Sequence, residues 1–138
     1  MGRREVASVL LDTHAWAWTF SEEASLSGAA RAAIDAATVV YVSAISCFEI
    51  GLKARLGKWP EMVPHVASLP TLLTRQGGTV VPVSATIASA AAGLDWAHRD
   101  PFDRMIAVTA LELRVALITA DRAFETLAET GTEVVRIW

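Results

Sequence analysis

Four acidic residues, far apart in the chain, are the candidates for chemistry: Asp12, Glu49, Asp103 and Asp121. Asp12 and Asp121 each follow a short apolar stretch typical of a buried parallel strand, and functional residues in such sheets gather beyond the carboxyl ends of the strands. Glu49 and Asp103 each lie near the start of a predicted helix, at the same edge of the sheet. Crowded carboxylates raise one another's pKa values unless a cation neutralises them. We therefore predict that the four acids bind a metal ion.

The type of ligand predicts the metal and its chemistry. Carboxylate oxygens favour Mg²⁺ or Mn²⁺, and such an ion can activate water and stabilise the charge that develops during phosphodiester hydrolysis. The net charge is −3, from 15 acidic and 12 basic residues, whereas proteins that hold nucleic acid by phosphate neutralisation alone are usually basic. This objection to nucleic acid weakens if some acids are metal ligands, because a bound cation reverses the local charge.

Each acid also has a purely structural interpretation. An Asp after a strand commonly caps a turn. Ser46 and Glu49 match a capping box, in which the acid bonds back to the start of its helix. Asp100, Pro101 and Asp103 have the pattern of a helix start, with Asp100 as N-cap. Capping and metal binding do not exclude each other, and the convergence of all four acids on one predicted edge favours a site.

The elements that must position these acids alternate along the chain. Apolar and β-branched runs predict strands over residues 6–11, 39–42, 79–83, 116–119 and 134–137. Capping residues and helix formers predict helices over residues 14–20, 29–37, 46–56, 66–75, 84–94, 100–114 and 123–129. This alternation predicts a three-layer α/β/α domain with a mostly parallel central sheet. We find no repeat or linker, so residues 1–138 are expected to form a single domain.

Several other classes of protein are disfavoured. No apolar run approaches the ~20 residues of a membrane span, and residues 6–11 are too short for a signal-peptide core, so a cytoplasmic location is expected. Cys47 is the only cysteine, which excludes a disulfide within the chain and favours a buried, inert thiol over a catalytic one. The sequence lacks the glycine-rich phosphate loops of nucleotide-binding folds and the G-x-S-x-G turn of serine hydrolases.

The histidines lack the spacing of a zinc site. His14 either supports Asp12 or packs beside the first helix. His98 either orients a phosphate or carboxylate or is a solvated loop residue. Trp16 and Trp18 are expected in core packing and at an interface.

The acids lie within ordered motifs, namely LLDTH at residues 10–14, VSAISCFEI at 42–50, HRDPFDRMIA at 98–107 and LITAD at 117–121. Across nearly the whole chain, their order and spacing resemble the PIN-domain ribonucleases, and within them the VapC-type toxins of bacterial toxin–antitoxin pairs. The resemblance implies a Rossmann-like PIN fold and Mg²⁺- or Mn²⁺-dependent endoribonuclease activity. It also implies a homodimer and an antitoxin whose C-terminal segment covers the active site.

The resemblance also assigns roles to residues. It implies metal ligation by Asp12, Glu49, Asp103 and Asp121. Thr119 matches a small hydroxyl residue that accompanies the last acid, and its alternative is an ordinary strand-end threonine. Asp100 is expected to support the site as a helix cap. Cys47 and Phe48 depart from the small residue and Trp of many relatives, and are expected to face the core.

Basic residues near the motifs are candidates for guiding RNA, namely Lys53, Arg55, Lys58 and Arg104. Arg104 is expected either to contact a phosphate or to pair with an acid. Lys53 and Lys58 more often mark a solvated helix face.

Two other functions remain open from the residues alone. One is a PIN-like binding module without catalysis, against which the complete set of four acids argues. The other is a metal-dependent phosphatase acting on small phosphoesters. Such an enzyme would normally have a second Asp two residues after a nucleophilic Asp12, and His14 occupies that position.

Overall fold

A five-stranded parallel sheet forms the middle of the protein, in a computed structural model that describes residues 7–138. Its strand order is β3-β2-β1-β4-β5, and all four pairings are parallel. The strands are β1 (Val9–Leu11), β2 (Val40–Ser43), β3 (Thr79–Val81), β4 (Ala116–Ile118) and β5 (Arg136–Ile137). The apolar run of β1 is completely buried, as expected for the central strand of a sheet covered on both faces.

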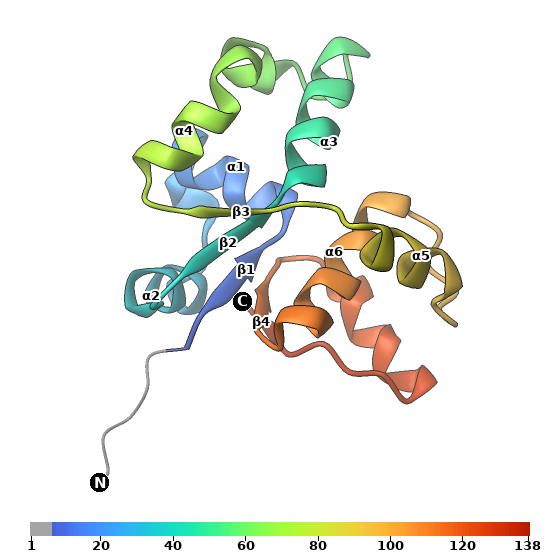
Figure 1. Cartoon of the computed structure of the whole chain (residues 1–138). Helices are drawn as coiled ribbons and strands as arrows, with labels where there is room; N and C mark the ends of the chain where they lie inside the picture. The colour runs from blue at the N-terminus through green and yellow to red at the C-terminus, as the bar shows by residue number, and fades with distance from the viewer. Residues whose placement is uncertain (1–6) are drawn as a thin grey trace, which may run out of the picture.

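Helices cover both faces of this sheet (Figure 1). The α-helices are α1 (Thr13–Ser21), α2 (Gly28–Ala36), α3 (Ala44–Arg55), α4 (Leu69–Arg75), α5 (Ala85–Gly93) and α6 (Pro101–Leu113), and the 3₁₀ helices are η1 (Glu23–Ser25), η2 (Pro60–Ser68) and η3 (Arg122–Thr130). Val9 and Leu11 pack with residues of α1, α2, η2 and α4, whereas Leu10 on the opposite face packs with α6 and η3. The predicted three-layer α/β/α architecture is confirmed.

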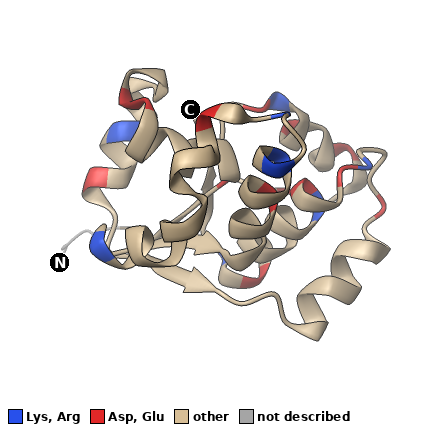
Figure 2. Ribbon diagram, turned by 90° about the horizontal axis from the view of Figure 1, so that it is seen from above, with Lys and Arg blue, Asp and Glu red and all other residues tan. Residues whose placement is uncertain are grey.

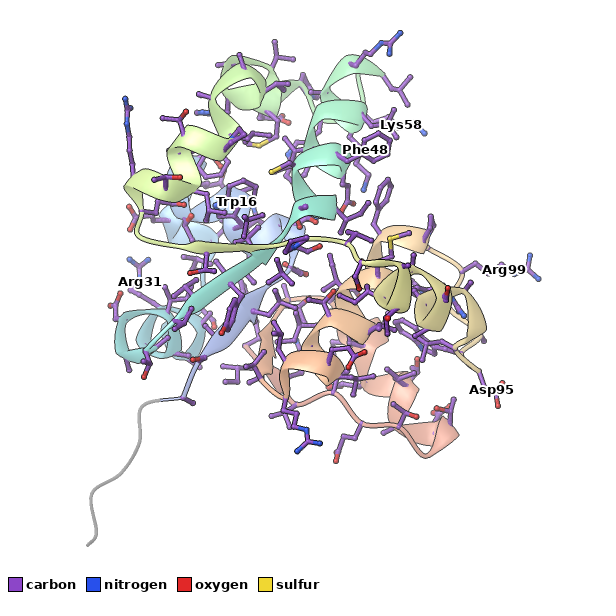
Figure 3. All side chains as sticks on the ribbon, in the orientation of Figure 1. Trp16, Arg31, Phe48, Lys58, Asp95 and Arg99 are labelled. Atoms are coloured by element: carbon purple, nitrogen blue, oxygen red, sulfur yellow. The ribbon has the colours of Figure 1, made fainter. Side chains whose placement is uncertain are left out.

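Trp16 shows how the first of these layers is filled. Its side chain is fully buried between α1 and the sheet, and its indole N–H donates a 2.9 Å hydrogen bond to Oε1 of Gln76, at the end of α4 (Figure 3). A buried Trp needs such a partner for its single donor. The expected core packing of Trp16 is confirmed.

The start of α3 differs from the sequence prediction. The helix begins at Ala44, directly after β2, and Ser43 is its N-cap, with Oγ accepting a hydrogen bond from the N–H of Ile45 at 3.1 Å. Ser46 instead forms a hydroxyl–hydroxyl contact of 2.8 Å with Thr13, which ties α3 to α1. The predicted capping box of Ser46 and Glu49 is therefore wrong. Glu49 lies beyond the first turn, and its carboxylate does not bond back to the helix start.

Other boundaries move by a few residues. The strand predicted over 6–11 begins at Val9, and Val6 lies outside the described residues. The strand predicted over 79–83 ends at Val81, before Pro82, which has no backbone N–H to donate, and it lies at the edge of the sheet. The prolines at 60 and 64 lie in the 3₁₀ helix η2, so the α-helix predicted from residue 66 starts only at Leu69. No helix within residues 7–138 is long and apolar enough to cross a membrane.

Candidate active site

A pocket of about 380 Å³ opens beyond the carboxyl ends of β1 and β4. Asp12 directly follows β1, and Asp121 comes shortly after β4. Glu49 reaches the pocket from α3 and Asp103 from the first turn of α6. The structure thus brings all four predicted acids to one cavity, together with Thr13, His14, Trp18, Lys53, Asp100 and Ala120.

Asp12 is the most constrained of these acids. Its side chain caps α1, with Oδ1 accepting from the N–H of Ala15 at 2.8 Å and Oδ2 accepting from Oγ1 of Thr119 at 2.5 Å. Burial raises the pKa of Asp12 to about 7 although both hydrogen bonds lower it, and the charges of Asp103 and Glu49 raise it further. Near neutral pH this carboxyl group is therefore partly protonated.

Glu49 is buried and only half satisfied. Its Oε2 is 2.5 Å from Nζ of Lys53, one helical turn further along α3, and only 4% of its side chain is exposed. Its Oε1 is buried without a hydrogen-bond partner among the described residues. Burial by itself would lower the pKa of Lys53, but the hydrogen bond and charge of Glu49 outweigh it and raise that pKa. Lys53 is therefore held as a cation inside the pocket, not on a solvated face.

Asp103 is paired with His98, so His98 orients a carboxylate and is not a solvated loop residue. The His98 Nε2 is 2.7 Å from Oδ2 of Asp103. Burial raises the pKa of Asp103 to about 6; His98 opposes this shift, while the charges of Asp100 and Glu49 add to it. Asp100 is the N-cap of α6, as predicted, with Oδ1 accepting from the N–H groups of Phe102 and Asp103.

Thr119 connects the two acids that follow strands. Its hydroxyl donates to Asp12 and accepts the N–H of Asp121 at 3.0 Å, and the residue is fully buried. Asp121 is exposed and also caps η3, with Oδ1 accepting from the N–H of Ala123 at 2.9 Å. Thr119 is thus not an ordinary strand-end threonine, because it sets the position of one acid relative to the other.

Arg104 does not have the predicted role. The Nε, Nη1 and Nη2 atoms of its guanidinium all donate to backbone carbonyls, at Ala91 and Ala92 in the last turn of α5 and at Leu94, Trp96 and His98 in the segment between α5 and α6. With its donors used in this way, Arg104 has no donor left for a phosphate, and it pairs with no acid among the described residues. The expectation is corrected: Arg104 fixes the segment that carries His98 and Asp100.

His14 and Trp18 line the pocket on α1, and sequence reasoning did not predict this arrangement. The His14 ring stacks on Trp59, with 4.3 Å between centroids and 22° between planes, and lies 5.8 Å from the tilted ring of Trp18. Burial of this imidazole is the main cause that lowers its pKa. Trp59 directly precedes η2. No local sequence pattern shows that it contacts His14, which lies 45 residues earlier in the chain.

Comparison with known proteins identifies the family. Residues 9–130 match the PIN domain. The chain belongs to the PIN-domain family. It is 34% identical over 118 residues to Ribonuclease VapC22 of Mycobacterium tuberculosis (strain ATCC 25618 / H37Rv), a match that covers 85% of this chain and 89% of the relative. The predicted resemblance to VapC-type PIN-domain proteins is confirmed.

Solved structures share the fold of this PIN domain. A toxin–antitoxin complex from Klebsiella pneumoniae superposes with a TM-score of 0.58 at 22% identity, over 83% of this chain and 87% of the other. VapBC2 from Rickettsia felis, bound to a DNA fragment from its promoter, gives a TM-score of 0.63 at 13% identity, over 95% and 99% of the two chains. At 22% and 13% identity, these similarities support a shared fold and no more.

The donor set of this PIN domain fits a hard divalent cation. Within residues 7–138, no three His, Cys, Asp or Glu side chains converge closely enough to share an ion as they stand. Thr119, Lys53 and His98 each hold an oxygen of one acid, at Asp12, Glu49 and Asp103 respectively. However, Oε1 of Glu49 is unpartnered, and burial raises the pKa values of Asp12 and Asp103, so a bound cation would stabilise the ionised forms of these acids. Oxygen ligands of this kind suit Mg²⁺ or Mn²⁺.

Proposed function

We propose that this PIN domain is a metal-dependent endoribonuclease that hydrolyses RNA phosphodiester bonds and leaves a 5′-phosphate and a 3′-hydroxyl. The observation that carries the proposal is the meeting of four acids from separate elements in one pocket, with one buried carboxylate oxygen unpartnered. The 34% identity to a ribonuclease supports it. We take residues 1–138 as one catalytic unit.

Asp12, Glu49, Asp103 and Asp121 would hold Mg²⁺ or Mn²⁺ through their carboxylate oxygens. When bound, the ion supplies positive charge at the phosphate and lowers the pKa of a water molecule. The chain is acidic, and Figure 2 shows its acidic and basic segments interspersed along the ribbon without a continuous basic face in that view. A cation in the pocket would therefore provide attraction for phosphate in a chain whose net charge is negative.

The protein's own groups position this chemistry. Thr119 fixes Oδ2 of Asp12 and the backbone of Asp121. Lys53 neutralises one oxygen of Glu49 and leaves the other for a ligand. His98 orients Asp103, and Arg104 holds the backbone of His98. Fixed ligands supported in this way keep their geometry during the reaction.

The proposal extends to partners and location. Two structures with this fold are described as a toxin–antitoxin complex and as VapBC2. By extension, we propose that this chain is the toxin of such a pair, is inhibited by a cognate antitoxin, acts as a homodimer and works in the cytoplasm.

The test is RNA cleavage by the purified protein and two active-site variants. Structured RNA with single-stranded loops is incubated with Mg²⁺, Mn²⁺ or EDTA, using the wild type, Asp12→Asn and Asp103→Asn. A matched control is Asp95→Asn, since Asp95 is exposed outside the pocket (Figure 3). We expect cleavage with a divalent ion by the wild type and by Asp95→Asn, and loss of at least 100-fold in the two site variants.

Parallel assays of the same proteins separate the ribonuclease from the phosphatase and the binding module. Cleavage that survives EDTA or both site substitutions contradicts the proposed mechanism. Hydrolysis of a small phosphomonoester, without cleavage of RNA, supports a phosphatase. Tight binding to a co-encoded small protein, with no cleavage of any RNA, supports a binding module.

A further inference from the structure

One side of the acid pocket is aromatic. His14 and Trp18, one helical turn apart on α1, both line it. Apart from Ala120, the remaining lining residues carry a carboxylate, an ammonium or a hydroxyl group. A substrate that places a phosphate among the acids therefore meets two flat rings beside them. The acids explain how the pocket would act on a phosphate, but they do not explain why two aromatic rings line it.

The His14 ring is held in a fixed orientation. One of its faces is covered by the indole of Trp59, at 4.3 Å and 22° from parallel. The residue as a whole is nevertheless exposed, and we take the face opposite Trp59 as the one open to a ligand. Trp59 is half-buried and packs against the core, which gives the stack a rigid support. A ring oriented before binding loses little conformational entropy when a ligand stacks on it.

Trp18 forms a corner with this ring. Its plane is tilted by 59° from that of His14, and it is backed by Trp138, at 5.7 Å and 51°. A planar group lying on the open face of His14 would therefore have Trp18 beside it. The two rings meet at a wide angle, and we take the space between them as the place for one flat heterocycle, with the acids left for the adjoining phosphate.

We propose that His14, supported by Trp59 and flanked by Trp18, stacks an unpaired RNA base next to the phosphodiester bond that is cut. The identity of the ligand as RNA rests on the proposed function. Stacking on aromatic side chains is a general mode of single-strand recognition, because every base has a π-face, and it requires a base that is not paired in a helix. The acids would then act on the phosphate and His14 would select unpaired segments.

The test measures binding without turnover. Fluorescein-labelled decamers of adenylate and of abasic ribose-phosphate are titrated with protein in Ca²⁺, and fluorescence anisotropy is recorded. The variants are His14→Ala, which removes the ring, and His14→Phe, which keeps a flat ring. The matched control is His65→Ala, since His65 also packs on an aromatic ring, Phe20 at 5.0 Å, but lies outside the pocket.

We expect His14→Ala to weaken binding of the adenylate decamer about tenfold. His14→Phe and His65→Ala should stay within about threefold of wild type, and abasic RNA should bind wild type and His14→Ala equally. Equal affinity of wild type for adenylate and abasic RNA would overturn the proposal, as would unchanged adenylate binding by His14→Ala. The outcome is independent of cleavage: a protein that cuts no RNA but loses adenylate affinity in His14→Ala refutes the proposed function and retains the stacking site.

Discussion

The hydroxyl of Thr119 donates a 2.5 Å hydrogen bond to Oδ2 of Asp12, across 107 positions of the sequence. The hydroxyl oxygen of Thr119 also accepts a hydrogen bond from the N–H of Asp121. A single hydroxyl thus uses both its donor and its acceptor capacity to fix two acids that follow different strands. This buried hydroxyl thus links the two acids in addition to the pairing of β1 with β4.

Replacing Thr119 by Val should therefore damage the site more than the fold. We expect metal affinity to fall by roughly 10–100-fold, because Asp12 loses the group that orients it, and stability to fall by about 1–3 kcal/mol. Isothermal titration with Mn²⁺ and urea denaturation measure the two effects. Thr119→Ser should retain both properties. Thr109→Val removes an equally buried hydroxyl that bonds only within α6, to the carbonyl of Met105, and should leave metal affinity unchanged.

The pKa of Asp12 predicts how stability depends on pH in the absence of metal. An acid whose pKa rises from 3.8 when unfolded to about 7 when folded costs stability as the pH increases through that range, because the folded state binds the extra proton. Between pH 5 and pH 8 in EDTA, wild type should lose about 2 kcal/mol more than Asp12→Asn, as measured by urea denaturation. Equal losses in the two proteins would show that Asp12 titrates normally. Added Mg²⁺ should restore wild type at pH 8.

Much of the fold could be predicted from sequence because its signals are local. The buried run before Asp12 predicts a central strand, and Asp100 followed by proline predicts the start of α6. The start of α3 was missed because two serines, Ser43 and Ser46, both have the chemistry of an N-cap. Only the contact between Ser46 and Thr13, from another helix, leaves Ser43 as the cap.

The candidate site likewise has features that the sequence predicts and features that it does not. The convergence of the four acids could be predicted, since parallel strands bring their carboxyl ends to one edge. The partners of the acids could not, because they depend on side-chain directions in three dimensions. Arg104 illustrates this limit: beside Asp103 in sequence, it extends to the carbonyls of another segment. The stack of Trp59 on His14 likewise joins elements that have no shared pattern.

In the metal-free protein, Lys53 should be the cation that neutralises Glu49. Lys53→Met leaves a buried carboxylate unpaired, so we expect a loss of about 3 kcal/mol in EDTA and a smaller loss in saturating Mg²⁺. Thermal denaturation in the two buffers measures this difference. Lys58→Met changes an exposed lysine just beyond the same helix and should show no such dependence on metal. The same loss with and without Mg²⁺ for Lys53→Met would contradict this role.

Arg104 should stabilise the segment before α6. Arg104→Met leaves several backbone carbonyls without a donor, and we expect a loss of about 2–4 kcal/mol with faster proteolysis between residues 91 and 100. Limited proteolysis with mass spectrometry locates the cut. Arg99→Met serves as control, because Arg99 is exposed and extends outward (Figure 3). Weaker RNA binding by Arg104→Met with unchanged proteolysis would instead favour a contact with phosphate.

The strand order has a consequence for synthesis on the ribosome. The central strand β1 is made before its neighbour β4, which comes after β2 and β3 along the chain. Until residues 116–121 have left the ribosome, Asp12 has neither Thr119 nor Asp121 beside it. A nascent chain, or one cut short before β4, therefore carries three of the four acids without the complete pocket. If the chain hydrolyses RNA as proposed, it would acquire that activity only after β4 and Asp121 have been made.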